Sequence, residues 1–258
     1  MFFLTYFFLL SGVPIMKNAN LIHGDALLEL KKLPSNSFDL ILSDPPYNSG
    51  GNTLSAVQIA PSKKYLEKDT FKRDAYAEIM GDQQSLFSFQ EWYLTWLNEA
   101  YRVMKPGGAM LLFCDWRSLP EVSSWGQWAN FLYKGIVVWN KKSARPLMYR
   151  FKHQAEYVTF FTKDKFEPNK NAGALPGVFE YAAPSPKNRK AMTEKPVDLL
   201  VELLKICKPG SKVLDPFMGS GSTLEACLRC DFDCVGIEKS LDYYLIAQER
   251  IGKFFEQE

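Results

Sequence analysis

A short apolar run that ends at two consecutive prolines limits where this part of the chain can lie in a fold. Residues 38–42 read Phe-Asp-Leu-Ile-Leu, the pattern of a short buried strand. The run leads into Asp44-Pro45-Pro46-Tyr47 and then into 48–51, Asn-Ser-Gly-Gly, which strands and helices tolerate poorly. The tetrapeptide should therefore lie where a strand leaves a sheet, and in open α/β sheets ligands bind at that edge.

The tetrapeptide offers hydrogen-bond acceptors and few donors. Pro45 and Pro46 have no backbone N–H and a fixed φ, so this stretch presents carbonyl oxygens, the Asp44 carboxylate and the Tyr47 ring. Such a set suits a planar substrate with an exocyclic amino group, such as adenine or cytosine. The structural alternative is a strand-end turn with Asp44 as a cap, but all four residues together after such a strand favour the functional interpretation.

Strand patterns and helical patterns alternate along the rest of the chain. We expect strands at 19–22, 38–42, 109–114, 135–139, 156–162, 212–214 and 234–237. We expect helices at 27–33, 89–104, 122–133, 196–207, from about 222 to 229, and from 241 onward. This alternation predicts an α/β fold with a doubly wound, mostly parallel sheet.

A second constellation follows the strand expected at 212–214. Asp215-Pro216-Phe217-Met218-Gly219-Ser220-Gly221-Ser222-Thr223 combines a strand end, a Gly-x-Gly turn and a helix N-terminus. Glycines at 219 and 221 let the backbone approach a ligand closely. Glu238, at the end of the next strand, is placed to accept hydrogen bonds from ribose hydroxyls. The pattern lacks the third glycine of a nicotinamide site and the Gly-Lys-Ser/Thr of a phosphate loop, so we expect another nucleoside cofactor.

Positive charge is concentrated in one segment of the 258-residue chain. Residues 141–190 contain eleven Lys or Arg and four acids, whereas the whole chain has a net charge of only +2. A basic segment on an acidic body predicts a polyanionic partner, with a solvated loop as the alternative. The segment 48–88 is long and polar and has no clear helix or strand periodicity, so we expect a mobile functional loop there.

The cysteines and the N-terminal residues indicate the compartment. Five cysteines form no disulfide framework, as expected in a reducing, cytoplasmic environment. Cys227-x-x-Cys230 with Cys234 has no further ligands to complete a zinc site, so we expect no metal and interpret these residues as small buried hydrophobes. Residues 1–15 are strongly apolar but too short to span a bilayer, so we expect an extension without a catalytic role and no membrane partner. The catalytic domain should be 16–258.

Taken together, these residues resemble the amino-methylating DNA methyltransferases, which use S-adenosylmethionine. The match rests on Asp44-Pro45-Pro46-Tyr47, on the segment from Asp215 to Thr223, and on their order, which resembles the β group of the family. In that group the basic segment, here about 141–190, lies between the two motifs and recognises duplex DNA. The resemblance implies a Rossmann-like, mostly parallel, seven-stranded sheet with one reversed strand.

The resemblance also implies roles for individual residues. Asp44 and the Pro45 carbonyl would accept hydrogen bonds from the target amino group, Pro46 would keep that segment rigid, and Tyr47 would stack on the flipped base. His23-Gly24-Asp25-Ala26-Leu27 resembles the segment that contacts the cofactor adenine, and Thr193-Glu194-Lys195-Pro196 the segment that closes on its methionine moiety. The expected cofactor-binding residues are Asp25, Ala26, Lys195, Asp215, Phe217, Gly219, Gly221, Thr223 and Glu238. For Asp25 a helix N-cap, and for Lys195 an ordinary surface position, are equally good interpretations.

Several alternatives remain open from the sequence. Asp at the first motif position favours adenine-N6 in this family, with cytosine-N4 as the runner-up. A methyltransferase acting on RNA or on a protein glutamine usually has Asn at that position and the reverse motif order, and an inactive nucleic-acid-binding subunit would show decay of one motif. Arg145 or Arg150 could read bases. A homodimer and a cognate restriction enzyme are both compatible with the resemblance.

Overall fold

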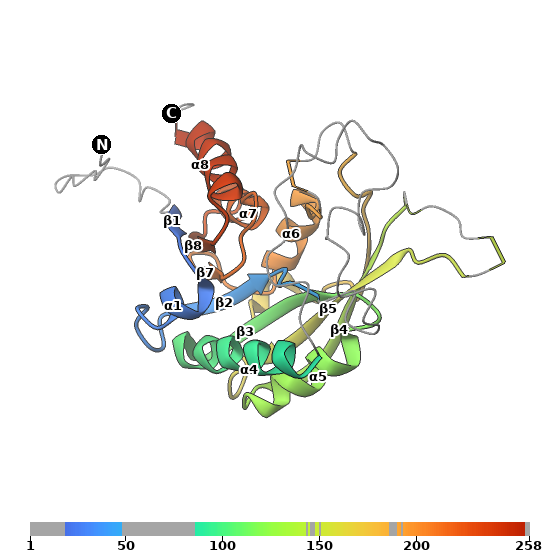
Figure 1. The fold of residues 1–258 in the computed structure, drawn as a ribbon, viewed down its shortest axis with the longest axis horizontal. Helices are drawn as coiled ribbons and strands as arrows, with labels where there is room; N and C mark the ends of the chain where they lie inside the picture. Colours follow the sequence, from blue (N-terminus) through green and yellow to red (C-terminus); the bar gives the residue numbers. More distant parts are fainter. Residues whose placement is uncertain are drawn as a thin grey trace.

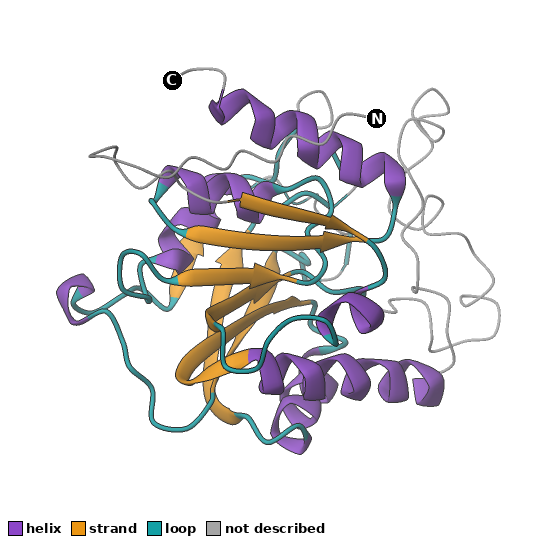
Figure 2. Ribbon diagram, turned by 90° about the vertical axis from the view of Figure 1, so that its left-hand side faces the viewer, coloured by secondary structure: helices purple, strands orange, loops and turns teal. Residues whose placement is uncertain are grey.

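The computed structural model describes residues 19–47, 86–142, 144, 148–149, 151–185, 190–191 and 193–255. They form a single mixed sheet with helices packed on both of its faces (Figures 1 and 2). The apolar extension at 1–15 and loop residues 48–85 lie outside the described residues, whereas 86–88 belong to a helix rather than to the predicted loop. Among the helices described, none has the length and apolar character needed to cross a membrane.

The sheet has eight strands in the order β1-β8-β7-β2-β3-β5-β4-β6. The strands are β1 (Ala19–His23), β2 (Phe38–Ser43), β3 (Met104–Cys114), β4 (Leu132–Asn140), β5 (Ala155–Thr162), β6 (Val178–Glu180), β7 (Lys212–Asp215) and β8 (Asp233–Glu238). All neighbouring pairs are parallel except β3 with β5 and β5 with β4. The strand β5 is therefore the one reversed strand, which confirms the predicted doubly wound, mostly parallel sheet.

The predicted count of seven strands was one too low. The additional strand, β6, has three residues, pairs in parallel with β4 and lies at the edge of the sheet. A single buried side chain, Phe179, lies between two exposed ones on this strand. So short a segment carries no recognisable periodicity, and its conformation depends on the backbone of β4 beside it.

Two apolar layers separate the sheet from its helices. One layer lies under α6 (Val197–Leu204), α7 (Ser222–Arg229) and α8 (Leu241–Phe255), and the other under α1 (Ala26–Leu30), α4 (Leu86–Val103) and α5 (Leu119–Trp128) (Figure 1). Strand β3 contributes to both layers in strict alternation. Ala109, Leu111 and Phe113 face the first layer, and Met110, Leu112 and Cys114 the second.

Several predicted boundaries were wrong, for local reasons. The helix predicted to reach 133 ends at Trp128 because Asn130 adopts a left-handed conformation, with φ of 69°, and the chain then enters β4. The strand predicted from 109 begins at Met104, where residues expected only to stop a helix already continue into the sheet. Helices α1 and α6 are shorter than predicted, and Pro196 is the N-cap of α6.

Candidate active site

The carboxyl ends of β2, β7 and β8 open into one pocket of about 830 Å³. The tetrapeptide that begins at Asp44 lines one side of this pocket, and the turn with Gly219 and Glu238 lines the other. The first residues of the two motifs, Asp44 and Asp215, are 171 positions apart in sequence, yet β2 and β7 are hydrogen-bonded neighbours in the sheet. The parallel pairing therefore brings both predicted motifs to one edge, as expected for a site in an open α/β sheet.

The Asp44 carboxylate has a hydrogen bond on each of its oxygens. Oδ1 accepts a hydrogen bond from the Tyr47 hydroxyl, and Oδ2 accepts one from the Lys195 ammonium at 2.5 Å. Lys195 Nζ also lies 5.4 Å from the Tyr47 ring centroid and 5.2 Å from that of Phe113. Lys195 is only 6% exposed, so the interpretation of this residue as a surface lysine was wrong.

The reversed strand supplies a second carboxylate to the same sheet edge. Because β5 runs against β3, its amino end lies beside the carboxyl ends of its neighbours, and Glu156 is its second residue. One Glu156 oxygen accepts a hydrogen bond from Lys141, and the other lies 3.4 Å from Lys195 Nζ. Asp44, Lys195, Glu156 and Lys141 thus form a chain of alternating charges, named here the acceptor network.

Burial and charge act differently on the two carboxylates of the acceptor network. Burial raises the pKa of Asp44 above its ordinary value, and the single ion pair with Lys195 does not fully reverse this. Burial also opposes ionisation of Glu156, but the ion pairs with Lys195 and Lys141 hold its pKa below the ordinary value. The pKa of Lys195 is raised because its two carboxylates outweigh its burial. The pKa of Asp44 is therefore shifted upward and that of Glu156 downward from their ordinary values.

The Gly-x-Gly turn is open toward the pocket where a ligand would lie. Gly219 has φ of 51°, and a Cβ built there would meet no protein atom within 4 Å. Gly221, with φ of 82°, is the N-cap of α7, and a Cβ there would lie 3.0 Å from the Ala247 side chain. Both positions require glycine for their backbone conformation, and Gly219 leaves room for close approach of a ligand.

Asp215 is a buried carboxylate at the end of β7. Its Oδ1 accepts hydrogen bonds from the Ser43 hydroxyl at 2.5 Å and from the Phe217 backbone N–H at 3.0 Å, and the Thr223 side chain also bonds to it. Burial raises the pKa of Asp215 to about 6. Within the part of the chain that is described, no Lys or Arg forms an ion pair with Asp215, so a cationic ligand group would stabilise its charged form.

Glu238 and Asp25 complete this side of the pocket. Glu238 accepts hydrogen bonds from the backbone N–H groups of Gly219 at 3.0 Å and Ser240 at 2.7 Å, and burial raises its pKa. Asp25 is the N-cap of α1, accepting from the Leu27 N–H at 3.0 Å, and forms an ion pair with Lys239 at 2.9 Å. The N-cap interpretation of Asp25 is thus confirmed, and its role toward a cofactor stays a prediction. Its neighbour Ala26 also lines the pocket.

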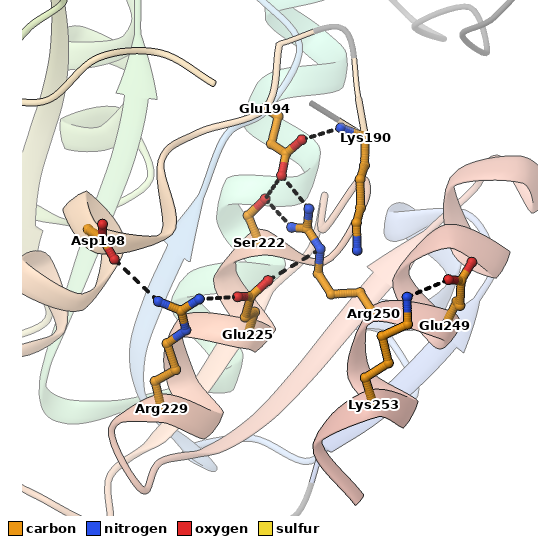
Figure 3. Close-up of polar contacts among 9 residues, drawn as sticks. All are labelled: Lys190, Glu194, Asp198, Ser222, Glu225, Arg229, Glu249, Arg250 and Lys253. Carbon is orange, nitrogen blue, oxygen red and sulfur yellow. Dashed lines mark hydrogen bonds and ion pairs between the residues drawn. The ribbon is translucent and has the colours of Figure 1, made fainter. Parts of the chain in front are cut away.

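The segment that carries Lys195 is fastened on its other side by Glu194. The Glu194 carboxylate accepts hydrogen bonds from the Arg250 guanidinium, from the Ser222 hydroxyl at 3.4 Å and from the Lys190 backbone N–H at 2.5 Å (Figure 3). Arg250 belongs to α8, and Ser222 is the first residue of α7. These contacts, named here the clamp network, tie the segment before α6 to two helices.

All predicted site residues line the pocket with the exception of Gly221, whose Cβ position faces Ala247 of α8. Sequence reasoning missed Glu156, Lys141 and Ser43, and it missed the aromatic pair of Trp116 and His153 at the pocket wall, whose rings are stacked 5.5 Å apart. A glutamate at the start of an otherwise apolar strand was the available signal for Glu156. Arg145 and Arg150 lie outside the described residues.

The described part of the chain contains no cluster of His, Cys, Asp or Glu able to hold a metal ion. Four of the five cysteines are buried and Cys230 is partly buried, which confirms their interpretation as small core residues. The donors and acceptors that remain fit a nucleoside with a cationic tail. Asp215 offers an uncompensated buried charge, Gly219 offers an open turn, and Phe217 offers an apolar wall.

A family model described as DNA methylase, of the N6/N4 type, matches residues 38–249. An Escherichia coli (strain K12) protein with the provisional name methylase YubD is 30% identical over 233 residues, covering 90% of this chain and 89% of that protein. The DNA adenine methyltransferase YhdJ of the same organism is 26% identical over 267 residues, covering 90% and 82%.

Solved structures share the fold. The complex of M1.HpyAVI with S-adenosylmethionine superposes with a TM-score of 0.65 at 23% identity, covering 90% of this chain and 98% of that one. The cytosine-N4-specific PvuII DNA methyltransferase superposes with a TM-score of 0.66 at 14% identity, covering 93% and 92%. At these identities the structural similarity establishes the fold alone. One of the two similar structures is of an enzyme named as cytosine-N4-specific.

Proposed function

Because this chain belongs to the N6/N4 DNA methylase family, we propose that it transfers a methyl group to the N6 amino group of adenine in duplex DNA. The observation that carries the proposal is the Asp44 carboxylate, partly buried at the end of β2 and sharing one pocket with the Gly219 turn. An amino nitrogen conjugated to a base ring is a weak nucleophile. A neighbouring carboxylate can strengthen it by accepting its N–H.

Asp44, Pro45 and Tyr47 have distinct proposed roles. The Asp44 carboxylate and the Pro45 carbonyl would accept the two N–H groups of the target amine, which orients the nitrogen and favours the positive charge that develops on it. Pro46 would keep the acceptors rigid, and the Tyr47 ring would stack on a base flipped out of the duplex. Because the pKa of Asp44 is raised, this carboxylate is also suited to accept the proton that the nitrogen must lose.

The proposed methyl donor is S-adenosylmethionine. When bound, it supplies an electrophilic methyl group that the amino nitrogen can attack in line. Asp215 would face its cationic amino-acid end, Glu238 its ribose hydroxyls, and Asp25 with Ala26 its adenine. Phe217, Gly219, Gly221 and Thr223 would form the cradle between them, and Lys195 lies next to that cradle. Most of the catalytic effect would come from proximity and orientation.

Duplex DNA is the proposed partner of the segment at 141–190. The described residues between β4 and β5 extend away from the sheet (Figure 1), and they include the fully exposed Tyr149 and Phe151. Exposed aromatic rings can stack on the bases of a nucleic acid, and the Lys and Arg side chains of the same segment can contact its phosphates. Binding should therefore weaken steeply as the salt concentration rises.

The choice of adenine rests on the leading Asp of the tetrapeptide and on the name of YhdJ. Cytosine-N4 remains the second candidate, because PvuII DNA methyltransferase shares this architecture and is named as cytosine-N4-specific. The acceptors in the pocket suit either amino group. The same fold serves adenine and cytosine methylation, so the target base is identified from the methylated nucleoside that the reaction produces.

The test is methyl transfer from labelled S-adenosylmethionine to unmethylated duplex DNA, followed by nucleoside analysis. The wild type should yield N6-methyladenine, and Asp44→Ala should lose at least about 10²–10³-fold in rate because an electrostatic stabiliser is removed. Asp39→Ala is a matched control, since Asp39 lies on the same strand but forms an ion pair with Lys105 outside the pocket.

The product decides between the candidates. N4-methylcytosine that disappears in Asp44→Ala would keep the mechanism and overturn adenine as the target. Tight cofactor binding with no product on DNA of varied sequence would contradict the proposal and direct attention to RNA or protein substrates. Equal loss of activity in Asp39→Ala and Asp44→Ala would remove the special role of Asp44.

A further inference from the structure

The acceptor network poses an electrostatic problem within the proposed function. Lys195 contacts Asp44 at 2.5 Å, and its positive charge lies beside the carboxylate expected to hold the amino group. A cation there fixes the carboxylate but also opposes the positive charge that develops on the amino nitrogen. At partly buried positions this opposition is weakly screened. Lys195 alone would therefore weaken the effect that Asp44 is meant to supply.

Glu156 lies on the opposite side of the same ammonium group. Its Oε2 is buried, lies 3.4 Å from Lys195 Nζ and has no hydrogen-bond partner among the described residues. Its other oxygen is bonded to Lys141, so Glu156 stays ionised. The negative charge of Glu156 opposes the positive charge of Lys195 next to Asp44, and Lys141 pairs with the other Glu156 oxygen.

We propose that Lys195 and Glu156 are positioning residues for Asp44. Lys195 fixes one carboxylate oxygen of Asp44, and Glu156 holds Lys195 in place and neutralises its charge toward the substrate. This inference rests on the proposed function, and it gives Lys195 a role distinct from the predicted contact with the cofactor. It also gives a reason for the reversed direction of β5, which brings Glu156 to the edge where Asp44 lies.

Other titratable groups near Asp44 do not supply this balance. The pKa values of Tyr47, Tyr93 and Cys114 are raised, mainly by burial, so all three are neutral near pH 7. Asp215 lies on the neighbouring strand, and its charge is coupled to that of Asp44 in the same sense as that of Glu156. Among the groups acting on Asp44 in the described structure, Lys195 is the cation and Glu156 the acid that contacts it.

The arrangement predicts opposite effects for its two members. Lys195→Met removes the cation that favours ionisation, so the pKa of Asp44 should rise. Glu156→Gln removes a like charge that disfavours ionisation, so the pKa of Asp44 should fall. If Lys195 and Glu156 merely supported the fold, replacing them would not shift the pKa of Asp44 in opposite directions.

The experiment is a titration of the Asp44 carboxyl carbon by NMR in the ligand-free protein labelled with ¹³C-aspartate, with Asp44→Asn to assign the signal. Lys205→Met is the matched control, because Lys205 caps the other end of α6 and forms an exposed pair with Glu202. A rise in Lys195→Met, a fall in Glu156→Gln and no change in Lys205→Met would support the proposal. An unmoved titration in both site variants, or movement in the same direction, would overturn it.

A rate measurement adds a second readout. On the DNA substrate, Glu156→Gln should lose about 10²-fold in kcat, with little change in cofactor Kd. Within the acceptor network of this variant, only the Asp44 carboxylate balances the two ammonium groups of Lys195 and Lys141. Lys195→Arg keeps the charge and should retain the wild-type titration of Asp44, which covers the case that Lys195→Met does not fold. A weaker cofactor Kd in Lys195→Met with an unmoved Asp44 titration would overturn the positioning role. The titration needs neither DNA nor cofactor, so it remains decisive even if no DNA is methylated.

Discussion

Glu194 and Lys195 are adjacent in sequence, yet their side chains enter two different ionic networks. Glu194 belongs to the clamp network with Arg250 and Ser222, and Lys195 belongs to the acceptor network with Asp44 and Glu156 (Figure 3 shows the first of these). Both networks are largely buried and both combine acids with bases. They differ in how completely their carboxylates are satisfied.

In the clamp network both oxygens of Glu194 accept hydrogen bonds, one of them from a backbone N–H. In the acceptor network one Glu156 oxygen has no hydrogen-bond partner among the described residues, and Asp44 faces the pocket. The clamp network also contains one buried atom without a hydrogen-bond partner in the described part of the chain, Arg250 Nε, which lies 3.4 Å from Glu225. The difference therefore lies in the carboxylates, because protein groups satisfy both oxygens of Glu194, whereas one Glu156 oxygen accepts no hydrogen bond from the described residues. The clamp network should therefore matter for stability, and the acceptor network for chemistry.

The largest effect on stability should come from Arg250→Met. Arg250 and Glu194 have side chains only 5% and 7% exposed, so removing the guanidinium leaves a buried carboxylate without its cation. We expect a loss of about 3–5 kcal/mol in the free energy of unfolding. The measurement is urea unfolding of the ligand-free protein at pH 7.

The same variant tests whether the two networks are independent. Arg250→Met should leave the NMR titration of the Asp44 carboxyl where it is in the wild type. If that titration moves as in Lys195→Met, the segment 193–196 shifts as a unit, and the division into a structural and a chemical network is wrong. A loss below about 1 kcal/mol would show instead that Glu194 finds another partner.

A smaller effect, with a characteristic pH dependence, is expected for Asp215→Asn. The pKa of Asp215 is about 6 in the folded protein and 3.8 ordinarily, so the folded state binds an extra proton between these values. The contribution of Asp215 to the free energy of unfolding is thus fully present below pH 3.8, and it is lost as the pH rises from 3.8 through about 6. The shift corresponds to about 3 kcal/mol.

Asparagine at this position keeps an oxygen for Ser43 and Phe217 but cannot ionise. Relative to the wild type, Asp215→Asn should therefore gain about 3 kcal/mol between pH 4 and pH 7 in urea unfolding. If the difference in unfolding free energy between Asp215→Asn and the wild type stayed constant from about pH 4 to pH 7, the raised pKa of Asp215 would be contradicted. Cofactor affinity should fall in the same variant, which would place Asp215, unlike the clamp network, on the functional side of the comparison.

The parts of the fold that the sequence predicted are those encoded locally. Residues 38–42 and 109–114 have the composition of buried strands, and the two motifs are contiguous stretches whose chemistry can be read residue by residue. The doubly wound, mostly parallel sheet was confirmed, and so was the one reversed strand, which the family resemblance implied. The turn at Asn130 was missed because a helical pattern does not reveal one residue in a left-handed conformation.

The missed residues depend on contacts between distant segments. Glu156 reaches Lys195 only because β5 runs against β3, and strand order is not visible in local periodicity. The burial of Lys195 follows from the packing of Tyr47 and Phe113 around it, which no pattern near position 195 records. A charged residue that opens an apolar strand is the one local sign that could have indicated Glu156.

The smallest effect should come from the solvent-exposed rim of the clamp network. Arg229 is 44% exposed and pairs with Asp198 at 3.2 Å and Glu225 at 2.5 Å (Figure 3). Arg229→Ala should cost about 0.2–1 kcal/mol in urea unfolding, and less at high salt, because water replaces most of what the pairs supply. Lys253→Ala, which removes a single exposed pair with Glu249, is the matched comparison. Since Glu225 also contacts Arg250, a loss above about 2 kcal/mol in Arg229→Ala but not in Lys253→Ala would mean that the rim and the buried core of the clamp network act as one cooperative unit.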